Sequence, residues 1–95
     1  MNYIINMLGE ANIPNLKNMG LSSIAMIVKK DWKKVHYSAA PYLSAMSSMA
    51  SIKDRYFADS GYSIVSYFLS NASSWKGPVA KEIKKELNRR LKENE

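Results

Sequence analysis

Cysteine is absent from this 95-residue sequence, and its absence excludes disulfide frameworks, thiolate metal sites and cysteine nucleophiles. A secreted domain of this size usually depends on disulfides, so we expect a cytoplasmic protein. Histidine occurs once, at His36, and the 8 acidic residues are scattered, which leaves no recognisable set of metal ligands. The glycines stand singly, so the sequence has no glycine-rich phosphate loop. We therefore expect neither a metal nor a cofactor.

A catalytic constellation is also missing from the sequence. His36 would need a nucleophile and an orienting partner to act as a general base. The many serines form no nucleophile-elbow or triad pattern. We interpret His36 as a surface or structural residue, and we predict a protein that is not an enzyme and has no catalytic or cofactor-binding residues.

Long apolar runs are lacking as well. Residues 35–52 and 60–75 carry no charge, but serines interrupt both stretches. A membrane span needs roughly 20 mostly apolar residues, so we interpret both stretches as buried core. The apolar N-terminal residues lack a basic leader and soon meet Glu10, so we expect no signal peptide. These features predict a soluble protein that does not contact a membrane.

Positive charge is what the chain has in excess. The net charge is +6, with 14 lysines and arginines against 8 acidic residues. The excess lies in residues 17–37 and 76–95, and the segment between them is neutral. A basic surface of this kind favours an anionic partner, either nucleic acid or an acidic protein face.

Hydrophobic residues make up 46% of the chain and aromatic residues 11%, which is enough for a folded core. The length fits one domain over residues 1–95, with a frayed tail at about 93–95. We predict the α+β class: a mainly helical small single domain of about four helices with a basic β-hairpin. An all-α fold is the alternative.

The spacing of apolar residues predicts where the helices lie. The expected helices are one over 2–11, one that starts at 39–41 with Ser38 as its cap, one from Asp59 or Ser60 to about 72, and one over 79–92. A helical turn at 15–19 is expected to close at Gly20 in a left-handed conformation. The helix that ends near 72 is expected to be central, because apolar residues nearly encircle it.

Residues 21–37 fit two patterns. Ile24, Met26 and Val28 alternate onto one face of a strand, and after a lysine-rich turn the chain would return as a second strand. A helix would also gather its apolar residues on one face. The β-branched residues favour a hairpin, which we predict. The helical alternative would place Trp32 in the core.

Candidate partner-binding residues come from three segments. They are Lys29, Lys30, Trp32, Lys33 and Lys34 of the expected hairpin, Tyr56, Phe57, Trp75 and Lys76 beside the central helix, and Lys81, Lys85 and Arg89 of the last helix. Clustered lysines neutralise phosphates, and a tryptophan among them can stack on a base. Charges at a hairpin tip also protect a sheet edge from aggregation, which is the alternative.

The other candidates have similar alternatives. Loop aromatics such as Tyr56 and Phe57 often anchor protein interfaces, but they also fold over cores as lids. Lys81, Lys85 and Arg89 recur every four residues, and like charges at this spacing cost stability unless a partner uses them. The apolar seam at 83, 87 and 91 could pair with its twin in a homodimer.

The stretch that begins Val35-His36-Tyr37-Ser38, together with the run from Ser63-Ile64-Val65 to Trp75-Lys76-Gly77, resembles a group of small phage and prophage proteins. The likeness covers the last two-thirds of the chain and is most specific in the second run. It brings no functional residues. It implies a phage or mobile-element protein in a bacterial host.

Small phage proteins without enzyme motifs often block a host or defence machine. We therefore predict a non-enzymatic inhibitor of a bacterial defence or host complex that acts by occlusion, as anti-CRISPR proteins do. The alternative is a nucleic-acid-binding accessory protein that uses a Lys/Trp hairpin and the basic C-terminal helix. Either protein would act in the host cytoplasm as a monomer or homodimer.

Overall fold

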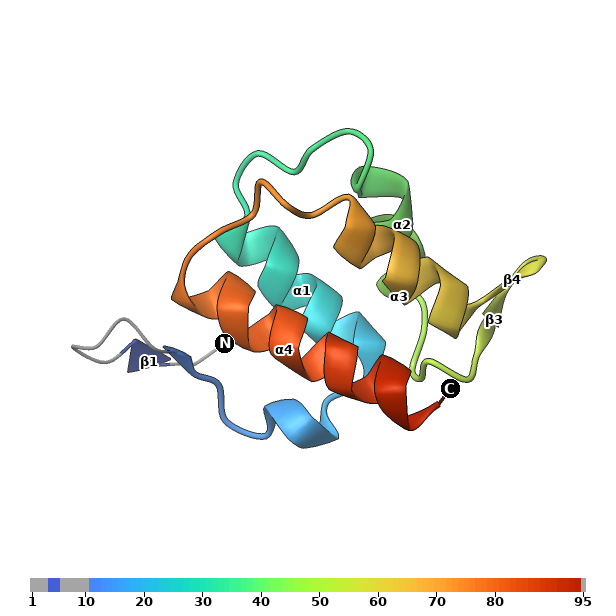
Figure 1. Ribbon diagram of the computed structural model, residues 1–95, viewed down its shortest axis with the longest axis horizontal. Helices are drawn as coiled ribbons and strands as arrows, with labels where there is room; N and C mark the ends of the chain where they lie inside the picture. Colours follow the sequence, from blue (N-terminus) through green and yellow to red (C-terminus); the bar gives the residue numbers. More distant parts are fainter. Residues whose placement is uncertain (1–3, 6–10, 95) are drawn as a thin grey trace.

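The computed structural model describes residues 4–5 and 11–94 of the chain. These residues form four α-helices: α1 (Leu21–Asp31), α2 (Ala40–Met46), α3 (Gly61–Ser70) and α4 (Pro78–Glu93), with a 3-10 turn, η1, at Leu16–Asn18. Two short antiparallel pairs complete the fold, β1 (Ile4–Ile5) with β2 (Ala11–Asn12) and β3 (Arg55–Tyr56) with β4 (Asp59–Ser60). Figure 1 shows the arrangement. The predicted α+β, mainly helical fold class is confirmed.

The core lies among the four helices. Helix α1 packs on α2 and α4, and α3 packs on the same two helices. The largest fully buried side chains are Leu21, Ile24, Ile27 and Val28 of α1, Met46 of α2, Val65 and Phe68 of α3, Trp75, and Val79, Ile83 and Leu87 of α4. Among the residues that the structure describes, no helix is both long enough and apolar enough to cross a membrane.

Helix α3, which is predicted to be central, packs on α2 and α4 but is not buried on all sides. Helix α3 buries one face, whereas its Tyr67 is 53% exposed. Helix α1 supplies a larger fully buried face than α3. The apolar residues around α3 therefore do not mark burial on all sides.

Residues 21–37 form a helix followed by a loop, so the predicted basic hairpin is wrong. On α1, Ile24, Ile27 and Val28 are fully buried together, and Met26 is 59% exposed. A strand would have placed Met26 with Ile24 and Val28. Burial of the helical face overrides the β preference of its branched residues, because that preference depends on packing context. The chain leaves α1 at Trp32, whose N–H donates to the Val28 carbonyl.

The N-terminal prediction also fails where it can be compared. Ile4–Ile5 pairs with Ala11–Asn12 as antiparallel strands, and the other residues of the expected 2–11 helix lie outside the described residues. The turn expected at 15–19 forms as η1. Its left-handed residue is Asn15 (φ 61°) rather than Gly20, which is extended (φ −71°) and is the N-cap of α1. Asparagine tolerates this conformation better than most residues.

The helix ends follow the sequence more closely. The Ser60 hydroxyl caps α3 by accepting from the Ser63 N–H at 3.2 Å, as predicted. Ser38 does not cap α2: the cap position is Ala39. Pro78 opens α4, where a missing N–H costs nothing. The tail expected to fray from 93 is still helical at Glu93, and residue 95 lies outside the described residues.

The segment between α2 and α3 packs backbone against backbone. The Asp54 carboxylate accepts from the Ala50 and Ser51 N–H groups at 2.9 and 3.0 Å. The Gly61 N–H donates to the Asp54 carbonyl at 2.7 Å. A Cβ on Gly61 would lie 2.6 Å from the carbonyl oxygen of Ile52. Only glycine therefore fits at the start of α3.

Gly61→Ala is expected to destabilise the protein by about 1–3 kcal/mol, the usual cost of forcing extra volume into a packed site. The measurement is the free energy of unfolding from urea denaturation. Ser23→Ala, at an exposed position of α1, is the control and should change stability by less than about 0.5 kcal/mol. An unchanged stability for Gly61→Ala would contradict this close approach.

Candidate functional site

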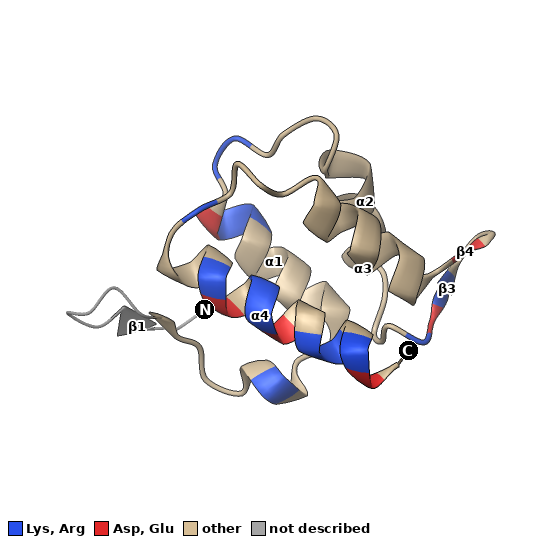
Figure 2. Cartoon of the chain, viewed as in Figure 1, with Lys and Arg blue, Asp and Glu red and all other residues tan. Residues whose placement is uncertain are grey.

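Lysines from separate segments gather at one end of the molecule (Figure 2). They come from the last turn of α1, the α1–α2 loop, the α3–α4 connection and the first turns of α4. We call this cluster the basic end: Lys29, Lys30, Lys33, Lys34, Lys76, Lys81 and Lys84. All of these side chains except the half-buried Lys84 are exposed. Six of them belong to the predicted candidates, and the structure brings them together without a hairpin.

Two stacked tryptophans join the segments that carry the basic end. The rings of Trp32 and Trp75 stack with centroids 5.8 Å apart and planes 13° apart. Phe68 meets both rings edge-on, at 6.3 and 6.4 Å. Trp32 is 7% exposed and Trp75 is 2% exposed. The prediction that these tryptophans contact a partner is therefore wrong, because a helical α1 turns Trp32 inward.

A hydrogen bond adds to this stacking contact. The Trp75 indole N–H donates to the Asp31 carboxylate at 2.8 Å. A buried indole N–H needs a hydrogen-bond acceptor. Asp31, the last residue of α1, supplies it. The end of α1 is thereby fastened to the segment that precedes α4. Lysines that are far apart in sequence become neighbours through this contact.

Lys84 was not among the residues predicted to bind a partner, although it lines the same pocket as Lys76 and Lys81. Its ammonium donates to the carbonyls of Ala72 and Trp75 at 2.7 and 2.6 Å. It also lies 5.8 Å from the Trp75 ring centroid. Desolvation, followed by the charge of nearby Lys76, lowers the pKa of Lys84. The sequence gives no sign of this role, since Lys84 resembles any other lysine of an amphipathic helix.

A pocket of about 300 Å³ opens at the first turn of α4. Lys76, Lys81 and Lys84 line it together with Gly77 and Ala80. Three cationic side chains therefore surround one concave surface. Such a surface attracts negatively charged groups.

Arg89 does not belong to this surface. Its guanidinium donates to both Glu86 oxygens at 2.9 and 2.8 Å and also to Glu93. Glu86 is the main cause of a raised pKa of Arg89. The expectation that Arg89 continues an unopposed basic row from Lys81 and Lys85 is wrong, since neighbours on its own helix already pair it.

Glu86 is the centre of a structural ion network. It is only 8% exposed and also accepts from Arg90 at 2.6 Å. Arg90 in turn donates to the carbonyls of Leu16 and Lys17, which ties η1 to α4. Desolvation raises the pKa of Glu86, but hydrogen bonds from Arg89 and Arg90 outweigh it and hold that pKa below its usual value.

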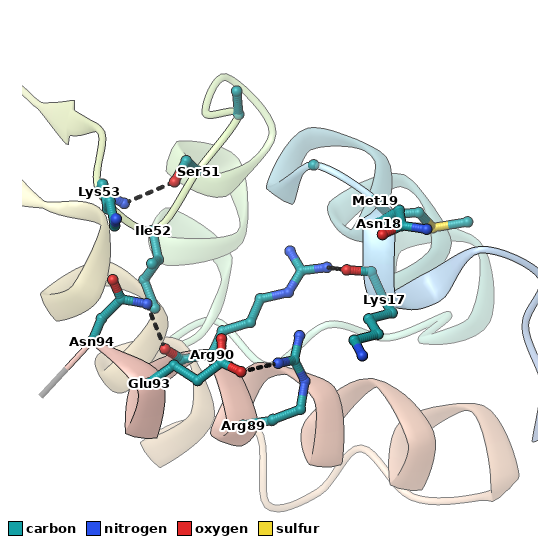
Figure 3. Close-up of a pocket in the computed structure, with 12 residues that line it drawn as sticks. Lys17, Asn18, Met19, Ser51, Ile52, Lys53, Arg89, Arg90, Glu93 and Asn94 are labelled. Atoms are coloured by element: carbon teal, nitrogen blue, oxygen red, sulfur yellow. Dashed lines mark hydrogen bonds and ion pairs between the residues drawn. The ribbon is translucent and has the colours of Figure 1, made fainter.

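This network lines a second pocket, of about 310 Å³. Figure 3 shows Arg90 reaching across it to Lys17, and Arg89 turned toward Glu93. Both guanidinium groups are thus committed to the protein's own acceptors. The network is structural, and we place no binding function in this pocket.

Tyr56 and Phe57 lie on the β3–β4 hairpin, which projects from the other end of the molecule (Figure 1). Phe57 is 88% exposed and adopts a left-handed backbone with φ 55°. Tyr56 is half-buried and meets the Phe57 ring edge-on at 4.8 Å. The structure therefore separates these candidates from the basic end. The predicted dimer seam does not face solvent, because Ile83 and Leu87 are fully buried in the protein's own core.

His36 forms a short local contact rather than a catalytic array. Its Nδ1 lies 2.6 Å from the Ser38 hydroxyl. No carboxylate of the described residues is hydrogen-bonded to this ring, and no group of three potential metal ligands occurs among the same residues. That the protein is not an enzyme stays a prediction.

Comparison of the chain with protein-family models, with curated proteins and with solved structures found no match. The resemblance to small phage proteins, and the host context that it implies, therefore stay predictions. What the site can do is argued below from its own geometry.

Glu86→Gln is expected to lower the free energy of unfolding at pH 7 by about 2–3 kcal/mol, since hydrogen bonds to charged groups contribute about 1.5–3 kcal/mol. The folded pKa of Glu86 lies below the unfolded value of about 4.3. Its contribution is therefore present above that value and is lost as the pH falls through the folded pKa. The parent–variant difference should shrink in acid.

Urea denaturation between pH 3 and pH 7 measures this difference. Glu82→Gln is the matched control, because no hydrogen bond or ion pair joins the Glu82 side chain to the other described residues. A difference for Glu86→Gln that stays constant with pH would contradict the role given to its charge.

Proposed function

We propose that the protein binds nucleic acid through the basic end and contacts mainly the phosphate backbone. One observation carries this proposal: lysines of several segments gather at one end of the molecule, where Trp32 stacks on Trp75. Among the described residues, none of these lysines takes part in an ion pair. Lysine ammonium groups act as point charges toward phosphate, so their convergence suits a chain of phosphates.

The placement of these lysines supports an anionic ligand. Lys29 and Lys30 lie in the last turn of α1, where the helix dipole stabilises a cation. Lys33, Lys34 and Lys76 lie in connections and gain nothing of this kind. Lys81 lies in the first turns of α4, near the positive end of that dipole, where a cation is unfavourable. A bound phosphate would offset that cost.

The burial of Trp32 and Trp75 limits the kind of nucleic-acid recognition that the basic end supports. Trp32 faces the core and cannot read a base, so the lysines would give affinity with little sequence preference. Such binding depends on the release of counterions and weakens steeply with salt. An acidic protein surface is the other partner that this charge could attract.

The test compares two triple variants with equal loss of charge. Lys33, Lys34 and Lys76 changed to Gln should weaken binding to labelled DNA and RNA at least 10-fold. The slope of log K against log salt should become shallower by about 2–3, because each phosphate contact contributes about 0.7–0.9. Fluorescence anisotropy titrations at about 50–200 mM salt, a range over which such binding changes strongly, measure both the affinity and the slope.

Lys17, Lys53 and Lys92 changed to Gln form the matched control, because all three are exposed and lie outside the basic end. This variant should keep most of the affinity. An equal loss in both variants would mean that net charge, rather than the basic end, attracts nucleic acid. If the parent binds polyglutamate and no nucleic acid, the partner is an acidic polypeptide.

A second candidate function rests on the hairpin tip. It is inhibition of a bacterial defence or host complex by occlusion, and Phe57 favours it. The ring is 88% exposed on a backbone conformation (φ 55°) that costs a non-glycine residue on the order of 1 kcal/mol. The Arg55 guanidinium donates to the Ala58 carbonyl at 3.0 Å, which closes the turn. A rigid exposed aromatic of this kind suits an interface anchor.

Phe57→Gly separates stability from binding at this tip. Glycine removes the left-handed strain, so the melting temperature should stay equal or rise by a few degrees. Capture of a protein target from a nuclease-treated bacterial lysate, read by mass spectrometry, should be lost. Tyr67→Ala, at another exposed aromatic, should retain capture. Identical captured proteins for the parent and Phe57→Gly would exclude Phe57 as an anchor.

A further inference from the structure

We propose that the α1–α2 loop carries a base-stacking platform, Tyr37 with His36, which makes the basic end prefer single-stranded over double-stranded nucleic acid. This inference rests on the proposed function, because the lysines would supply the electrostatic part of the binding. Neither residue was predicted to contact a partner. Tyr37 belongs to the second strand of the predicted hairpin, which the protein does not form.

The platform is an exposed aromatic ring that stacks on its neighbour in the loop. Tyr37 is 83% exposed, and among the large hydrophobic side chains of the described residues only Phe57 is more exposed. Its ring stacks on His36 with centroids 4.6 Å apart and planes 29° apart. One face of Tyr37 is thus occupied by His36, and the ring is otherwise open to solvent. An incoming base can extend this stack.

Local hydrogen bonds orient the His36 ring and its backbone. The His36 Nδ1 lies 2.6 Å from the Ser38 hydroxyl, which fixes the ring. The His36 carbonyl accepts from the N–H groups of Ala39 and Ala40 at 2.9 and 3.1 Å. Ala39 is fully buried, so this end of the loop is anchored to the core.

The opposite end of the loop is anchored at Trp32. That residue is stacked on Trp75, and its N–H donates to the Val28 carbonyl at 2.8 Å. Both ends of the loop are therefore held by buried residues. A stacking residue that is held before binding loses less conformational entropy when the ligand arrives.

The platform and the lysines share one loop. Lys33 and Lys34 precede Tyr37 by four and three residues, and n residues of chain span at most about 3.3–3.6 Å × n. The ammonium groups and the ring therefore lie within the reach of one oligonucleotide. Aromatic side chains beside a positively charged surface are how proteins hold single strands without reading sequence.

Base stacking distinguishes the two forms of nucleic acid. In a duplex the base faces are stacked on one another, so only phosphates are accessible to the basic end. In a single strand a base can leave its neighbours and stack on Tyr37. Such stacking contributes about 1–3 kcal/mol per base, and this contribution would be absent for a duplex.

The experiment measures affinities for a fluorescein-labelled oligothymidine and for a labelled DNA duplex of the same length by anisotropy. Tyr37→Ala should weaken binding to oligothymidine about 5- to 100-fold and leave duplex binding unchanged. Tyr37→Phe keeps the ring and should retain the parent affinity. Circular dichroism melts of the variants should match the parent, because the Tyr37 side chain is exposed.

The outcomes separate this inference from the proposed function. Equal losses on both probes, or no loss on oligothymidine, would overturn the platform while the lysines remain the binding surface. A parent that binds neither probe would overturn the platform and the proposed function together. Loss on oligothymidine alone, restored in Tyr37→Phe, would establish base stacking at this loop.

Discussion

The stack of Trp32 on Trp75 is the contact on which the arrangement of the basic end depends. It joins the end of α1 to the segment before α4, and Asp31 completes it by accepting the indole N–H from a residue 44 positions away. Lys84 adds a clamp on the same segment through the Ala72 and Trp75 carbonyls. These contacts fix the α1–α2 loop and the α3–α4 connection, which carry Lys33, Lys34 and Lys76, beside the lysines of α1 and α4. The apolar core thus decides where the charge is displayed.

Much of the helical framework could be predicted from local signals. The Ser60 cap, the Gly77-Pro78 boundary and the apolar stripe of α4 each involve neighbours within a turn or two. The N-terminal third resisted prediction because residues 21–37 satisfy two periodicities. What decides between them is a partner surface formed by Phe68 and Trp75, far along the chain. A short window of sequence does not contain that information.

In the candidate site, too, local sequence signals were predictable and contacts between distant segments were not. The clustering of lysines was predictable from charge, since Lys29, Lys30, Lys33 and Lys34 are adjacent in sequence. Charge did not predict which of the candidate side chains stay exposed and unpaired. Trp32 is buried, Arg89 is paired with Glu86, and Tyr37 is exposed where a strand had been expected. Exposure and pairing are properties of the folded molecule, and they move aromatic residues in and out of a site that charge alone locates.

The β3–β4 hairpin and the basic end project from different ends of a molecule about 43 Å long. A ligand on one of these surfaces leaves the other uncovered, so the two candidate functions do not compete for space. If both proposals are correct, the protein would bring a nucleic acid bound at its lysines beside a protein bound at its aromatic tip. Its length would then set the distance between them.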